Sequence, residues 1–305
     1  MREQKLNRQK PVEFLVVVCG RDSGYLLLKN GNISFRIKFS KEVYIMTRYY
    51  CSGFDVNNIF GHGLGDMLKA ELKDMKSIVY IPGGVKKIPK TKEKYIPNFT
   101  DNFKKAGIVF ETVNLITPDI SSEQAREMIK NASFVMLMGG DPFKQKALCE
   151  KLDIMDELKN YKGIMLGFSA GAMLMSKYII VTPCSDEYPD FRIEPGLNLD
   201  GISIYPHNNT ADTEYPDKLV SGDETYKKSD LIQVAKQYGP FYLLQDNERE
   251  NGSVDVSLIR VSNGNIKYYT ENDGKIWMVD KSIEMVFGPK KLPEMQKIAK
   301  SDREY

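Results

Sequence analysis

The chain has 305 residues, of which 42% are apolar and 28% charged, and its 43 Lys and Arg against 41 Asp and Glu give a net charge of +2. A nearly neutral chain has no overall field to attract nucleic acid or an anionic membrane, so neither partner is expected. The length permits a sizeable apolar core, and the composition is that of a globular protein that folds without a partner.

The cysteines are scattered, with no C-x-x-C pair and no nearby His at ligand spacing. They are Cys19, Cys51, Cys149 and Cys184. This predicts neither a zinc site nor a disulfide framework, and reduced thiols in the cytoplasm are the simplest interpretation. Arg21 and Asp22 interrupt the first apolar run before a signal peptide or a membrane span is complete, so export is not expected.

Residues 1–45 contain three short β-like runs, at 14–18, 25–28 and 33–39, with a turn at Asn30-Gly31. Two interpretations stay open. The segment is an appended β-hairpin, or it is an extension outside the native protein, because Met46 stands just before the first regular strand. We expect residues 46–305 to form a single α/β domain.

From Arg48 onward, strand-like runs alternate with helical patterns, as in a mostly parallel sheet with helices on both faces. Gly107 is expected to stop one helix, and Ser121 with Gln124 forms a capping box that opens another. The predicted strands are 49–53, 77–82, 108–115, 134–138 and 164–166, and the predicted helices are 66–75, 95–106, 121–131 and 142–158.

The pattern changes after Ala172, where polar loops precede a predicted helix at 227–237 and a series of strands. Asn263-Gly264 and Asp273-Gly274 are typical hairpin turns. The C-terminal part is therefore expected to add antiparallel strands to the sheet, with a polar helical tail from Glu294.

The segment Gly167-Phe168-Ser169-Ala170-Gly171 is a G-x-S-x-G motif between an apolar strand and a helix of small residues. Its glycines permit a sharp turn that exposes the serine hydroxyl, and the next backbone N–H faces a developing oxyanion. Gly139 and Gly140 end the preceding strand, so two Gly-rich turns are expected at the same sheet edge. This favours Ser169 as a nucleophile over a turn without a catalytic role.

A serine nucleophile needs a base, and the chain has two histidines. His207 ends a predicted strand after the motif and is expected to reach back over the same edge. His62 lies in an early Gly-rich loop and has no comparable position. His207 is therefore the predicted base.

The third member of such a site is a carboxylate that orients the imidazole. The residues between the serine and the histidine leave several acids open: Asp186, Glu187, Asp190, Glu194 and Asp200.

Three segments resemble the serine peptidase family of dipeptidase E (aspartyl dipeptidase) and cyanophycinase. They are the turn at 138–143, the motif at 167–172 and the strand at 197–207 that ends in Pro206-His207. The resemblance extends from about Met46 to about Val279. It implies a class I glutaminase-like (flavodoxin-like) three-layer sandwich with serine in place of cysteine.

The resemblance also implies the roles of individual residues. Asp186 is the implied triad acid, with Glu187 and Glu194 as alternatives, and the backbone N–H groups of Gly140 and Ala170 are the implied oxyanion hole. No metal or organic cofactor is implied.

The implied substrates are small peptides, above all dipeptides with an N-terminal aspartate. Asp141 departs from the family pattern, and its carboxylate would repel an acidic substrate unless it points away. Arg192 and Arg249 are candidate cations for such a substrate. A cyanophycinase-like hydrolase of β-aspartyl peptides and a non-catalytic binding protein are the alternatives, and the chain is expected to be a monomer or a homodimer.

Overall fold

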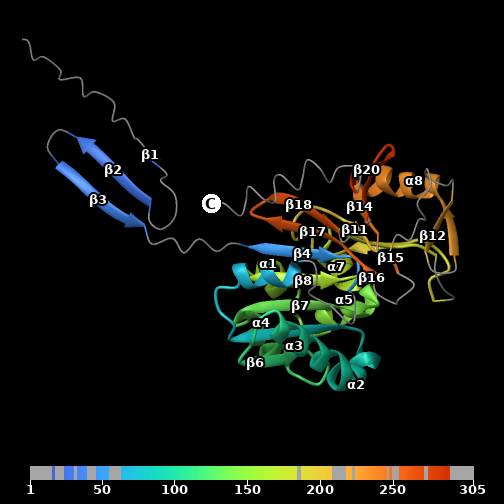
Figure 1. The fold of residues 1–305 in the computed structure, drawn as a ribbon, viewed down its shortest axis with the longest axis horizontal. Coiled ribbons are helices and arrows are strands. Elements are labelled where there is room, and N and C mark those ends of the chain that lie inside the picture. The colour runs from blue at the N-terminus through green and yellow to red at the C-terminus, as the bar shows by residue number, and fades with distance from the viewer. Residues whose placement is uncertain are drawn as a thin grey trace, which may run out of the picture. The chain divides into compact units, whose positions relative to one another are not determined.

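The computed structural model describes side chains at residues 46–54, 63–183, 187–207, 229–245, 256–270 and 274–288, apart from Lys87. It describes the backbone alone at Lys87 and at 16–17, 24–30, 33–39, 218–221, 224–228, 247–248 and 254–255. The chain divides into two compact units, Met1–Tyr44 and Ile45–Tyr305 (Figure 1).

The first unit contains a three-stranded antiparallel sheet of β1 (Val16–Val17), β2 (Gly24–Asn30) and β3 (Ile33–Phe39). Asn30 at the end of β2 pairs with Ile33 at the start of β3. The strands on either side of the predicted Asn30-Gly31 turn therefore pair as a hairpin does.

The second unit is built on a seven-stranded sheet with the order β18-β17-β4-β8-β7-β5-β6. The strands are β4 (Thr47–Cys51), β5 (Ser77–Gly83), β6 (Thr112–Leu115), β7 (Phe134–Gly140), β8 (Ile164–Phe168), β17 (Ser257–Ser262) and β18 (Asn265–Thr270). The five strands from β4 to β6 pair in parallel, and β17 and β18 are added antiparallel beside β4. The predicted α/β class, with antiparallel strands added by the C-terminal part, is confirmed.

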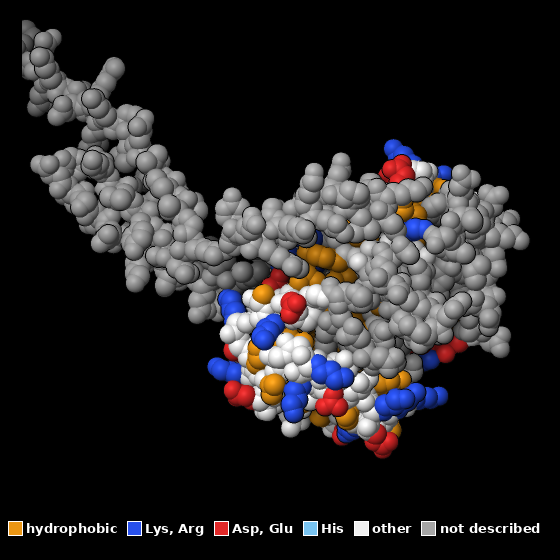
Figure 2. Space-filling model, viewed as in Figure 1, with side chains coloured by type: hydrophobic (Ala, Val, Ile, Leu, Met, Phe, Trp, Pro, Cys, Tyr) orange, Lys and Arg blue, Asp and Glu red, His pale blue; other side chains and the backbone are white. Residues whose placement is uncertain are grey.

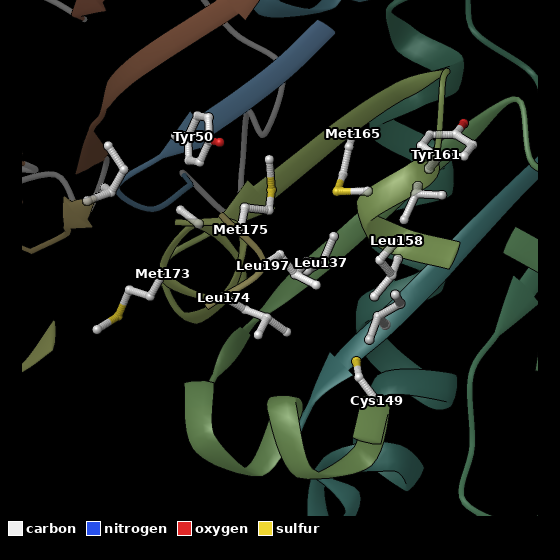
Figure 3. Close-up of a cluster of buried hydrophobic side chains, with 14 of the residues drawn as sticks. Tyr50, Leu137, Cys149, Leu158, Tyr161, Met165, Met173, Leu174, Met175 and Leu197 are labelled. Atoms are coloured by element: carbon white, nitrogen blue, oxygen red, sulfur yellow. The ribbon is translucent and has the colours of Figure 1, made fainter. Parts of the chain in front are cut away.

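Helices cover both faces of this sheet because successive residues of each buried strand point to opposite sides. Phe134 and Met136 of β7 pack in one cluster with the helices α1 (Leu64–Glu71) and α3 (Ile96–Lys105). Val135 and Leu137 pack in the other cluster, with the helices α4 (Ser122–Lys130), α5 (Pro142–Lys151), α6 (Met155–Asn160) and α7 (Ala170–Met175). Figure 3 shows part of this second cluster, with Leu137 among side chains of α7.

The connection from β5 to α3 is helical from Val85 onward. A 3-10 turn (Val85–Lys87), the short helix α2 (Ile88–Lys90) and a π-helical segment (Thr91–Tyr95) lead into α3. This connection begins at the edge of the sheet where the parallel strands end, because it directly follows β5.

A smaller sheet has the order β11-β14-β19-β20 and packs with helix α8 (Lys228–Tyr238) around a third apolar cluster. Its strands are β11 (Ile204–Tyr205), β14 (Phe241–Leu244), β19 (Ile276–Val279) and β20 (Ile283–Phe287). The remaining strands form three antiparallel pairs, β9 (Tyr178–Val181) with β10 (Arg192–Pro195), β12 (Lys218–Ser221) with β13 (Glu224–Lys227), and β15 (Asn247–Glu248) with β16 (Val254–Asp255).

Two local predictions are confirmed. Ser121 and Gln124 form a reciprocal capping box at the start of α4. Asn263 and Gly264, both with positive φ, join β17 to β18.

Three other predictions are wrong. The helix expected at 142–158 is two helices, because α5 ends at Lys151 and Asp153, with φ 51°, interrupts it before α6. Asp273-Gly274 does not join a hairpin, because β18 and β19 belong to different sheets. The strand expected from Ile108 begins at Thr112, because the Ile108 N–H closes the end of α3 by donating to the Phe103 carbonyl. The predicted tail from Glu294 lies outside the described residues.

Within the described residues, no helix has the length and apolar character needed to cross a bilayer. Acidic and basic side chains are interspersed over the described part of the face shown in Figure 2.

Candidate functional site

Ser169 stands at a sharp turn between the buried strand β8 and helix α7. Its backbone has φ 49° and ψ −110°, a conformation that non-glycine residues rarely adopt and that is typical of a nucleophile elbow. The Ser169 N–H donates to the Cys51 carbonyl at the end of β4 (3.0 Å), and the Ser169 carbonyl accepts from the Met173 N–H (3.0 Å). The strained residue is thus held from both sides.

The glycines of the motif are required by the closeness of the backbone around them. A Cβ on Gly167 would lie 2.5 Å from the Ala172 nitrogen, and a Cβ on Gly171 would lie 2.1 Å from the Leu137 carbonyl oxygen. Real Cβ atoms do not approach backbone atoms so closely. The small residues of this segment therefore allow α7 to pack directly on β7 and β8.

His207 follows β11 and brings its imidazole to the serine. The distance between His207 Nε2 and Ser169 Oγ is 2.6 Å, within hydrogen-bonding range. Like Ser169, His207 has a positive φ, of 57°. An imidazole in this position can take the serine proton as a general base.

Ser176, one residue beyond α7, connects that helix to the strand before the histidine. The buried Ser176 hydroxyl donates to the Ala172 carbonyl (2.8 Å) and accepts from the Ile204 N–H of β11 (3.0 Å). The two ends of α7 therefore both connect to the Ser169–His207 pair. Ser169 directly precedes the helix, and Ser176 holds β11, the strand that leads to His207.

The Gly139-Gly140 turn at the end of β7 lies beside the serine. A Cβ on Gly139 would lie 3.7 Å from the Ser169 Cβ. Gly140 has φ 144°, and a Cβ there would lie 2.6 Å from the Gly83 carbonyl oxygen. The Asp141 N–H donates to the same Gly83 carbonyl (2.8 Å), which secures the turn against the end of β5.

Gln145 of α5 contacts the ends of both β5 and β7. The sequence pattern did not predict this contact. Its fully buried amide donates from Nε2 to the carbonyls of Ile81 (2.9 Å) and Met138 (3.1 Å), where the register between β5 and β7 shifts. The only sequence signal is a polar residue on the helix face that also presents Leu148 and Cys149.

The Asp141 carboxylate is turned toward α5, whose N-terminus it caps. Oδ1 accepts from the backbone N–H groups of Phe143 and Lys144 (both 3.0 Å), and Oδ2 accepts from the Tyr188 hydroxyl (2.8 Å) and lies 3.0 Å from Lys144 Nζ. Burial acts to raise the pKa of Asp141, but the hydrogen bonds from the Lys144 N–H and the Tyr188 hydroxyl hold the pKa below its ordinary value. The negative charge of Asp141 is therefore balanced by Lys144 and by the hydrogen-bond donors around it.

Four of the five candidate triad acids lie among the described residues. Asp186 lies outside the described residues, and Asp190 is exposed. Glu187 forms an ion pair with Lys144 (2.7 Å), Glu194 is paired with Lys146 (2.8 Å) and Arg192 (2.6 Å), and Asp200 accepts from the Tyr50 hydroxyl (2.7 Å). The identity of the acid stays a prediction.

The two candidate cations stay candidates, and the second histidine, His62, is not the predicted base. The Arg192 guanidinium is paired with Glu194 and lies 3.9 Å from the centre of the Phe143 ring. Arg249 and His62 lie outside the described residues. In the part of the chain that the structure describes, no three His, Cys, Asp or Glu side chains gather as a metal site requires.

Comparisons with known proteins point to one family. The model of peptidase family S51 matches residues 52–248. Peptidase E of Nostoc sp. (strain PCC 7120 / SAG 25.82 / UTEX 2576) is 28% identical over 144 residues, which cover 45% of this chain and 54% of that protein. The matched stretch thus spans about half the length of this relative.

Two solved structures have similar folds. A peptidase from an acI-B1 Actinobacterium superposes with a TM-score of 0.54 at 15% identity, over 80% of this chain and 95% of that one. A candidate peptidase E protein from Listeria monocytogenes EGD-e gives a TM-score of 0.50 at 13% identity, over 75% of this chain and all of that one. At such identities the likeness concerns the fold alone, and it agrees with the mostly parallel sheet described above.

Proposed function

Since the chain belongs to peptidase family S51, we propose that it is a serine peptidase with Ser169 as the nucleophile and His207 as the general base. The observation that carries the proposal is the 2.6 Å contact between Ser169 Oγ and His207 Nε2, made by a serine on a strained strand-to-helix turn. A buried structural serine would need neither the strain nor the imidazole.

The proposed reaction is acyl transfer in two halves. Ser169 Oγ attacks the scissile carbonyl carbon while His207 Nε2 accepts the hydroxyl proton. The backbone N–H groups of Gly140 and Ala170 stabilise the oxyanion of the tetrahedral intermediate, and His207 then protonates the leaving amine. Water, deprotonated by His207, hydrolyses the acyl-enzyme, and Asp186, or else Glu187 or Glu194, orients the imidazole.

We propose dipeptides with an N-terminal aspartate as the substrates. The turn of the Asp141 carboxylate toward α5, with its Lys144 and Tyr188 partners, supports this by lessening the repulsion of an acidic substrate. A β-aspartyl peptide is the alternative substrate, and a non-catalytic binding protein of the same fold is the alternative function. A location in the cytoplasm is part of the same proposal.

The test is hydrolysis of Asp-Leu, Glu-Leu, Ala-Leu and β-Asp-Arg by the purified protein and by its Ser169→Ala and His207→Ala variants. We expect Asp-Leu to be cleaved fastest and each variant to lose on the order of 10⁴- to 10⁶-fold in kcat. Preference for β-Asp-Arg would favour the cyanophycinase-like alternative.

A fluorophosphonate probe provides an activity measurement that does not depend on the choice of substrate. It labels only an activated serine, so the parent protein should be labelled and both variants should not. Absence of labelling in the parent, with no peptide cleaved, would favour the non-catalytic alternative.

A further inference from the structure

A small cavity opens beside the Gly139-Gly140 turn, on the face of the sheet that α3 covers. Its volume is about 150 Å³. The described residues that line it are Phe54, Gly83, Thr91, Tyr95, Phe99, Met138 and Gly139.

The aromatic rings that line this cavity pack against Phe168, the last residue of β8, which directly precedes the proposed nucleophile. The rings of Phe54 and Phe99 lie 5.3 Å apart, and both contact the ring of Phe168, at 5.0 and 6.1 Å. Phe168 directly precedes Ser169, and Gly139 of the cavity is also the glycine beside the Ser169 Cβ. The cavity therefore adjoins the proposed point of bond cleavage.

The chemistry of the lining selects an uncharged occupant. Among the described lining residues the side chains are aromatic rings, a thioether and the hydroxyls of Thr91 and Tyr95, and none is charged. A carboxylate there would lose its hydration without gaining a cation from these described residues, which is costly. An apolar cavity of this volume matches a group the size of benzene.

We propose that this cavity receives the apolar side chain of the second residue of the substrate, of leucine or phenylalanine size. The inference rests on the proposed function, because an N-terminal aspartate as the first residue leaves only the second to supply an apolar group. It adds a specificity site, with Thr91 and Phe99 as the residues that set its size.

The experiment compares Asp-Leu, Asp-Phe, Asp-Trp and Asp-Ala as substrates. For the parent protein we expect kcat/KM for Asp-Leu and Asp-Phe to exceed that for Asp-Ala by about 10-fold or more, as for other apolar pockets that discriminate by size. Thr91→Phe fills the cavity and should reduce this ratio to about 2-fold or less.

Two further variants serve as controls. Thr91→Val keeps the shape of the side chain and should retain the parent ratio, and Phe99→Leu enlarges the cavity and should raise kcat/KM for Asp-Trp relative to Asp-Leu. If peptides are cleaved but the Leu to Ala ratio is the same in all variants, the inference is overturned and the proposed function stands. If Thr91→Phe does not fold, the Phe99→Leu result decides.

Benzene binding, measured by isothermal titration calorimetry, tests the cavity without catalysis. We expect binding to the parent and to Thr91→Val and loss of binding in Thr91→Phe. If benzene binds in this pattern but no peptide is cleaved, the proposed function is wrong and the cavity is a site for another apolar ligand. If the parent protein does not bind benzene, the proposed site is overturned.

Discussion

Individual residues at the sheet edge have backbone conformations that are unfavourable for their residue type. The backbone of Ser169 costs about 1–3 kcal/mol relative to a relaxed conformation. Its hydrogen bonds to Cys51 and Met173 and the tight packing of Gly167 and Gly171 offset this cost. The conformation of the proposed nucleophile therefore depends on neighbours in β4, β8 and α7.

Gly171→Ala and Gly264→Ala should differ in their effect on stability. At Gly171 the new Cβ meets the Leu137 carbonyl, so the free energy of unfolding should fall by about 3 kcal/mol. At Gly264 the new Cβ meets nothing within 4 Å and only the φ of 78° is unfavourable, so the loss should be about 1 kcal/mol. Urea denaturation followed by circular dichroism measures both, and equal losses would contradict the role given to Gly171.

Asp141→Ala should destabilise the protein in a pH-dependent way. Removal of the N-cap of α5 should cost about 1 kcal/mol at pH 7. Because the pKa of Asp141 is held below its ordinary value in the folded state, its contribution is present above the unfolded pKa and is lost as pH falls through the folded pKa. The stability difference between the parent and the variant should therefore shrink on acidification below about pH 4.

Asp141→Asn is the matched control, since an amide caps a helix but does not titrate there. Thermal unfolding of the three proteins from pH 7 to pH 3 makes the comparison. A parent-to-Ala difference that is constant over this range would show that the carboxylate charge contributes nothing.

At the scale of elements, helix α7 helps to fix the position of Ser169 relative to His207. All six of its residues are buried, and it contacts β7, β8 and β11. Such a helix has little freedom to shift, because its surroundings are close-packed. The distance between Ser169 and His207 is therefore set by how α7 and β11 pack, and Ser176 is the polar contact between them.

Ser176→Ala should weaken both stability and reactivity. It leaves the buried Ile204 N–H without its acceptor, which should cost about 1–3 kcal/mol in the free energy of unfolding. The strand before His207 loses a tether, so the rate of fluorophosphonate labelling at Ser169 should fall by about 10-fold or more. Ser229→Ala, at an exposed serine, is the control and should stay within about 0.5 kcal/mol of the parent. An unchanged labelling rate would contradict the positioning role.

At the scale of the whole molecule, the second unit has an apolar core of its own. All three buried clusters consist of residues from Tyr49 onward, within Ile45–Tyr305. The family match at 52–248 lies within the same unit. This supports the proposal that residues 46–305 form a single domain.

A protein comprising residues 46–305 should therefore fold and react like the full chain. We expect its midpoint of urea denaturation and its rate of fluorophosphonate labelling to match those of residues 1–305, because the clusters and the Ser169–His207 pair are retained. An insoluble or unlabelled product would show that the first unit contributes to folding or to the site.

The amino-acid sequence by itself determined the features that neighbouring residues decide. The Ser121 capping box and the Asn263-Gly264 turn follow from contacts and backbone preferences within a few residues. The alternation of strands and helices also predicted the parallel sheet, because buried strands and their covering helices have distinct apolar patterns.

Only the tertiary structure decided the features that depend on distant partners. Asp273-Gly274 has the pattern of a hairpin turn, yet β19 pairs with β14 and β20, where its Trp277 and Val279 are buried in the third apolar cluster. The Gln145 brace and the 2.6 Å approach of His207 to Ser169 likewise require segments far apart in the chain to pack together. The physical reason is that long-range pairing is selected by the burial of whole faces, which no local pattern specifies.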